Sequence, residues 1–89
     1  MVSRYKYLHS LDLSCSSFET LPRLIGMLKH LRCLSLRYNK KIKRLPDSVC
    51  KFQNLQALWL RGCANLETLP KGFKNWISLH DFEINTKQY

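Results

Sequence analysis

Residues 31–36 read Leu-Arg-Cys-Leu-Ser-Leu, and this pattern of apolar and variable positions recurs three more times in the chain. The other copies begin at residues 8, 55 and 79, so successive copies start 23, 24 and 24 residues apart. A second landmark, the dipeptide Leu-Pro, ends at residues 22, 46 and 70 and keeps the 24-residue interval. Two landmarks with one period indicate that the chain is built from a single repeated unit.

The unit has the pattern of a leucine-rich repeat, whose period is about 20–29 residues. Its central alternation has the period of a β-strand, so Leu11 and Leu13 are predicted to point inward and Asp12 outward. After each proline, which suits the first position of a helix, apolar residues three apart predict a short α-helix or 3-10 helix. These pairs are Ile25 and Leu28, Val49 and Phe52, and Phe73 and Trp76.

We therefore predict an α/β fold, a leucine-rich-repeat solenoid forming a horseshoe segment of about 3.5 repeats. A parallel sheet would line the concave face, and short helices or 3-10 turns the convex face. Residues 1–89 are interpreted as one domain fragment with repeats starting at 8, 31, 55 and 79, and 1–7 as the tail of a preceding repeat. Each repeat contacts only its neighbours, so the two open ends predict marginal stability for the isolated chain.

One polar position in each repeat is predicted to turn inward and hydrogen-bond backbone groups that the turn leaves unpaired. It lies eight residues after the first leucine of the repeat and is occupied by Ser16, Asn39 or Cys63.

Composition and motifs argue against several classes of function. The chain carries 15 Lys and Arg against 6 Asp and Glu and is therefore strongly basic. It has no apolar run near the ~20 residues of a membrane span, and no secretory signal is recognisable in its sequence. The four cysteines are widely spaced without a C-x-x-C pair, which predicts reduced thiols and no metal site. No histidine motif or Gly-rich phosphate loop is present. We therefore expect no enzyme activity, no cofactor and no small-molecule substrate.

Three longer strings of sequence carry a resemblance to a known family. The stretches Tyr7–Ser14, Lys41–Cys50 and Leu66–Phe73 are similar to the leucine-rich repeats of plant nucleotide-binding disease-resistance proteins, and specifically to their coiled-coil subclass. The resemblance implies a cytoplasmic segment of an immune receptor that acts in the defence response through protein–protein contact. Its implied partners are a pathogen effector, a guarded host protein, or the receptor's own nucleotide-binding module, which the repeats would hold inactive.

Two other classes of leucine-rich-repeat protein remain as alternatives. A free-standing intracellular scaffold or adaptor also uses the Leu-Pro repeat. An extracellular plant receptor fits less well, because its repeats carry G-x-I-P where this chain has x-x-L-P, and because the chain has no glycosylation sequon.

The outward positions of the strands predict a partner-binding surface on the concave face. Trp59 is an aromatic residue at an outward position, flanked by Arg37 and Arg61, and Trp, Tyr and Arg are enriched at interface hot spots. The alternative is that Trp59 only stacks flat against the arginine stems. The predicted concave-face residues are Arg37, Tyr38, Trp59, Arg61, Asp81 and Glu83.

A second candidate surface is the basic turn, which consists of Lys40, Lys41, Lys43 and Arg44. Segment 31–54 holds most of the positive charge, and the repeat frame makes Ile42 a buried position within the turn. A solvated turn is the simplest interpretation, and an electrostatic contact with an acidic protein is the functional one. Nucleic acid is the least favoured partner, and we predict none.

Overall fold

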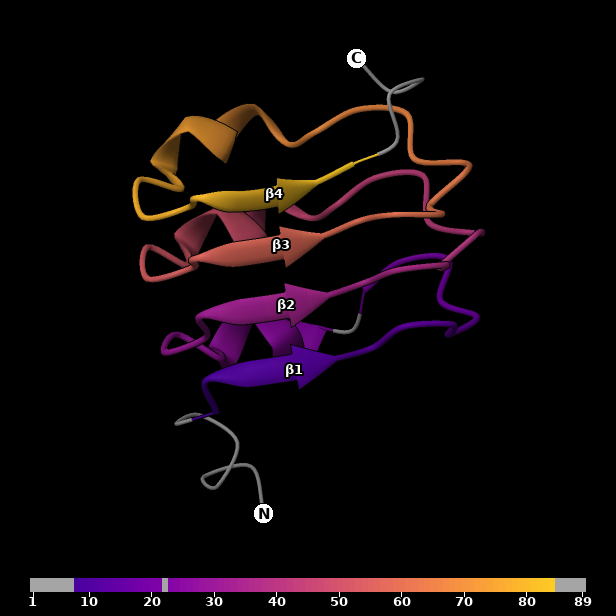
Figure 1. The fold of residues 1–89 in the computed structure, drawn as a ribbon. Helices are drawn as coiled ribbons and strands as arrows, with labels where there is room; N and C mark the ends of the chain where they lie inside the picture. Colours follow the sequence, from indigo (N-terminus) through magenta and orange to yellow (C-terminus); the bar gives the residue numbers. More distant parts are fainter. Residues whose placement is uncertain (1–7, 22, 85–89) are drawn as a thin grey trace.

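The computed structural model describes residues 8–21 and 23–84. Each repeat contributes one short strand: β1 (Ser10–Asp12), β2 (Cys33–Ser35), β3 (Ala57–Trp59) and β4 (Asp81–Glu83). The strands pair in parallel in the order β1-β2-β3-β4 (Figure 1). The predicted solenoid with a parallel sheet is therefore confirmed. The proposed tail at residues 1–7 lies outside the described residues.

The strand register places equivalent positions of successive repeats side by side. Leu11 pairs with Leu34, Leu34 with Leu58, and Leu58 with Phe82. Leu34 and Leu58 are completely buried, whereas Leu11 and Phe82 at the outer strands are only partly buried. The difference follows from the stacking, because an inner strand has a neighbouring repeat on both sides and an outer strand of the described part has one.

Three short 3-10 helices form the outer layer: η1 (Arg23–Met27), η2 (Asp47–Lys51) and η3 (Lys71–Asn75). They lie together on one side of the sheet (Figure 1). Pro46 and Pro70 precede η2 and η3 with extended ψ angles of 153° and 150°, so each occupies the N-cap and not the first helical position that we predicted. An extended proline lets the chain leave the preceding turn before the helix begins.

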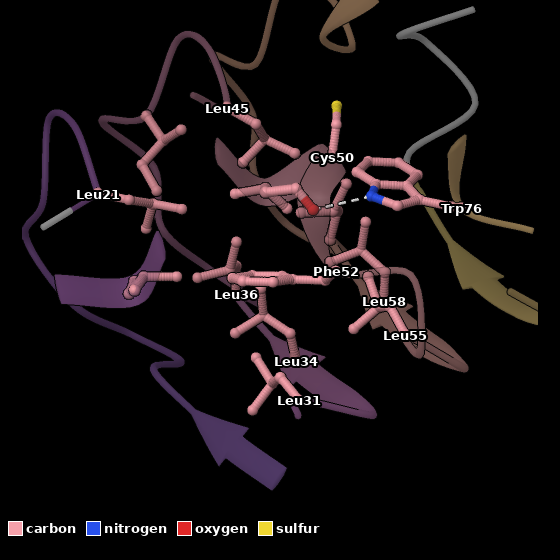
Figure 2. Close-up of a cluster of buried hydrophobic side chains, with 14 of the residues drawn as sticks. Leu21, Leu31, Leu34, Leu36, Leu45, Cys50, Phe52, Leu55, Leu58 and Trp76 are labelled. Carbon is pink, nitrogen blue, oxygen red and sulfur yellow. Dashed lines mark hydrogen bonds between the residues drawn. The ribbon is translucent and has the colours of Figure 1, made fainter. Parts of the chain in front are cut away.

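The hydrophobic core fills the space between the sheet and the outer layer (Figure 2). Phe52 is fully buried there, and Trp76 donates a hydrogen bond from Nε1 to the carbonyl of Val49 at 2.9 Å. Of the apolar pair Phe73 and Trp76, only Trp76 is buried, because the side chain of Phe73 is 51% exposed. Phe73 lies on η3, which has η2 on one side and no further helix on the other among the described residues.

The inward polar position behaves as predicted in all three repeats. Asn39 is fully buried, and its Nδ2 donates to the carbonyls of Leu13 at 2.9 Å and Leu36 at 2.8 Å. Cys63 Sγ donates to the Leu36 carbonyl at 3.0 Å, and Ser16 Oγ donates to Leu13 at 2.9 Å. Asn39 thereby ties the turns of two successive repeats together, which is the role of a buried amide with two donors.

Candidate partner-binding surface

The strand register aligns the outward positions of the repeats into columns on the concave face. The first column is Ser10, Cys33, Ala57 and Asp81, and the second is Asp12, Ser35, Trp59 and Glu83. These are the columns that the repeat predicts, although Ala57 and Ser35 are both only 5% exposed. Ala57 has a short side chain, and Ser35 Oγ shares a hydrogen bond with Ser14 Oγ at 2.8 Å. The repeat frame predicts a third column of Ser14, Arg37, Arg61 and Asn85, of which Asn85 lies outside the described residues.

Two arginines of different repeats converge on one carboxylate, and we call these three residues the arginine fork. Arg37 donates from Nε to Glu83 Oε1 at 2.7 Å and from its terminal nitrogen to Glu83 Oε2 at 3.1 Å. Arg61 donates to Glu83 Oε2 at 2.7 Å. A carboxylate held by one bidentate and one single arginine contact is fixed more firmly than an ordinary surface ion pair.

Trp59 lies beneath the arginine fork. The guanidinium carbon of Arg37 is 5.0 Å from the centre of the indole ring, within the range of a cation–π contact. Trp59 is therefore half-buried and not the freely exposed aromatic residue that the alternation predicts. Arg37 supplies this cover, so the ring is stacked as in the alternative interpretation, while the interface role of Trp59 stays a prediction.

The hydrogen bonds of the fork fix its protonation state. The bonds from Arg37 lower the pKa of Glu83, and the same bonds raise the pKa of Arg37. Elsewhere on the face, hydrogen bonds from Ser14 lower the pKa of Asp12. Glu83 and Asp12 are therefore ionised at neutral pH.

The concave face by itself is not strongly basic. Its described outward positions hold two arginines against three acids, namely Arg37, Arg61, Asp12, Asp81 and Glu83. The arginines are also partly neutralised by the fork. What distinguishes this face is an aromatic ring enclosed by a charge network.

The exposed positive charge is concentrated on the basic turn and not on the concave face. Lys40, Lys41, Lys43 and Arg44 are all exposed, while Ile42 is only 1% exposed and anchors the turn, as predicted. Three of the cations line an open depression together with Glu19, Thr20 and Asn65: Lys41, Lys43 and Arg44. The ion pairs found within the described residues involve the fork alone.

Tyr38 directly follows Arg37 of the fork in the sequence, and its ring lies beside Gly62 of the next repeat. It adopts a left-handed φ of 61°, as do Cys15 at 60° and Gly62 at 78° at the equivalent positions of their repeats. A Cβ atom on Gly62 would lie 2.3 Å from the Tyr38 ring, so the glycine makes room for it. Tyr38 remains 45% exposed at the rim of the candidate surface. Among these three residues only Gly62 is of a type that favours a left-handed backbone, and the repeat pattern did not predict this shared conformation.

Other kinds of site are not supported within the described part of the chain. No group of three His, Cys, Asp or Glu side chains there could hold a metal ion. All four cysteines are free thiols, and burial raises the pKa of Cys50 and Cys63. None of the described helices combines the length and apolar character that crossing a membrane requires.

Comparison with known proteins agrees with the geometry. Residues 2–88 match the family model described as a leucine-rich repeat region. The chain is 28% identical to TMV resistance protein N of Nicotiana glutinosa over 81% of its length. It is 36% identical to disease resistance protein RPP4 and 32% identical to disease resistance protein RML1B, both of Arabidopsis thaliana, over 81% and 89% of its length. The matched segment spans 8%, 6% and 7% of these relatives, respectively.

Proposed function

The chain belongs to the leucine-rich repeat family and is homologous to plant disease-resistance proteins, and we propose that it is the partner-recognition segment of an intracellular immune receptor. The observation that carries the proposal is the family match over residues 2–88 together with relatives named for disease resistance. The segment would act by protein–protein contact, recognising an effector or a guarded host protein, or restraining the receptor's nucleotide-binding module. The proposal concerns the receptor family and not its coiled-coil subclass, which the relatives do not support.

Two surfaces of the segment suit this role, and they suit different parts of it. The concave face offers Trp59, Tyr38 and the arginine fork, which supply the residue types of an interface hot spot on a rigid sheet. The basic turn offers a dense positive field, which would steer an acidic partner and weaken as salt is added. We propose that the concave face provides specificity and the basic turn accelerates association.

The first test is the transcript that encodes the chain. An open reading frame that continues upstream into a nucleotide-binding module supports a receptor segment. A stop codon directly upstream favours the free-standing scaffold or adaptor. The transcript decides between these two functions without assuming anything about the partner.

The second test is a binding experiment with the nucleotide-binding module of the same transcript. Arg61→Glu and Lys43→Glu reverse charges on the concave face and on the basic turn, and each should reduce capture of the module. Lys74→Glu on η3 is the matched control, because it reverses an exposed lysine on the convex side. Equal capture by all three variants would contradict both surface assignments.

A further inference from the structure

We propose that Glu83 occupies, within the chain, a binding site for a partner's carboxylate, and that an acidic residue next to an apolar one is what this concave face recognises. The inference rests on the proposed function and specifies the chemistry of the partner. It is carried by the arrangement of the arginine fork over Trp59.

The contacts of the fork are those of a carboxylate receptor. Arg37 and Arg61 come from different repeats and donate to the same carboxylate at 2.7–3.1 Å, Arg37 to both oxygens and Arg61 to Oε2. Planar, bidentate binding of a carboxylate is the geometry to which arginine is best suited. Glu83 reaches the two arginines from β4, and it follows Arg37 by 46 residues in the sequence.

The receptor remains accessible to a second carboxylate. The side chain of Arg61 is 57% exposed and that of Arg37 is 34% exposed, whereas Glu83 is 21% exposed. Glu83 is attached through a flexible side chain to the last described strand, so it can leave the fork while the arginines keep their backbone positions. An incoming carboxylate would then make the same hydrogen bonds that Glu83 gives up.

Trp59 determines what should lie beside that carboxylate. In the arrangement in which Arg37 reaches across β3 to Glu83, its guanidinium covers the indole ring at 5.0 Å. When Arg37 turns toward a partner, part of the ring becomes available to an apolar side chain. This additional contact separates a matching partner from a free anion, for which the exchange with Glu83 brings no gain.

The test uses the full 89-residue chain and an acetylated, amidated tetrapeptide with a central Glu-Phe pair, at low salt. Glu83→Gln removes the internal competitor while it preserves side-chain volume, and binding followed by NMR should tighten by about tenfold. Asp47→Asn is the matched control, because it removes the same charge from the exposed surface of η2, on the convex side, and should change the affinity by less than about twofold. The peptide with Gln in place of Glu should bind no variant.

Two outcomes would overturn the inference and differ in what they say of the proposed function. If wild-type protein binds the peptide but Glu83→Gln does not bind it more tightly than Asp47→Asn does, Glu83 is not a competitor, and the concave face remains a binding surface. If no variant binds, the concave face does not recognise acidic peptides, and both the inference and the concave-face assignment fail.

A measurement on the wild-type chain guards against a variant that does not fold. The carboxyl pKa of Glu83, followed by NMR, starts below its ordinary value because of the arginine contacts. Saturation with the peptide should raise this pKa toward the ordinary value, since Glu83 loses its partners. A pKa that stays low in the complex would show that Glu83 keeps the fork, and would overturn the inference.

Discussion

Replacing Gly62 with alanine should destabilise the chain through two separable effects. The first is backbone strain, because Gly62 has a φ of 78°, and a left-handed conformation costs a residue with a Cβ atom about 1–2 kcal/mol. The second is steric, because the new Cβ would lie 2.3 Å from Cδ1 of Tyr38 and would force the ring away from the next repeat. The displaced ring should cost a further ~0.5–1.5 kcal/mol of packing.

A double-mutant cycle separates the two effects. Tyr38→Ala removes the ring, so the double variant should keep the strain and lose the clash, giving a coupling of about 0.5–1.5 kcal/mol. Urea unfolding followed by circular dichroism measures each free energy of unfolding. If Gly62→Ala costs the same with and without Tyr38, the ring contact contributes nothing and the steric argument is refuted. If Gly62→Ala costs nothing at all, the left-handed conformation is refuted as well.

Three further predictions concern the core and the fork. Leu34→Ala should lower the free energy of unfolding by about 2–5 kcal/mol, because Leu34 is fully buried in the middle of the sheet, and urea unfolding measures the loss. Asn39→Ala should cost about 1–3 kcal/mol by the same assay, since it removes two hydrogen bonds of a fully buried amide, although both carbonyls keep another donor. The pKa of Glu83 is depressed in the folded chain, so the fork stabilises the fold above the ordinary pKa near 4.5 and stops doing so as pH falls through the lower folded value. Thermal midpoints should drop across this acidic window in the wild type and drop less in Glu83→Gln, and equal drops would contradict the assignment.

The strand positions and the buried side chains could be predicted from the sequence because they follow from periodicity alone. A strand buries alternate residues, so the register of Leu11, Leu34 and Leu58 is contained in the 23- and 24-residue spacing. The inward turn of Asn39 and the burial of Ile42 follow from the same frame. These features depend on the repeat and not on any particular neighbour.

The arginine fork could not be predicted in this way, because it depends on which side chains reach one another. The columns place Arg37 and Arg61 next to Trp59, but both arginines could equally have extended into solvent. Their bonds with Glu83 depend on side-chain length and on how the three adjacent strands β2, β3 and β4 are arranged. Phe73 also depends on a neighbour: the equivalent residues Ile25 and Val49, whose helices are followed by another helix, are buried, whereas Phe73 on the last described helix is exposed.

The fork also departs from the way a solenoid is usually stabilised. In a stack of repeats, each unit contacts the next, and stability is close to a sum of nearest-neighbour terms. Arg37 passes over β3 and bonds Glu83 on β4, which couples the second and fourth repeats directly. A change at β4 that moves Glu83 would therefore alter the position of Arg37 and the exposure of Trp59 without any deformation of β3. The concave face thus has a local link by which the occupancy of one carboxylate site can alter the surface presented two repeats away.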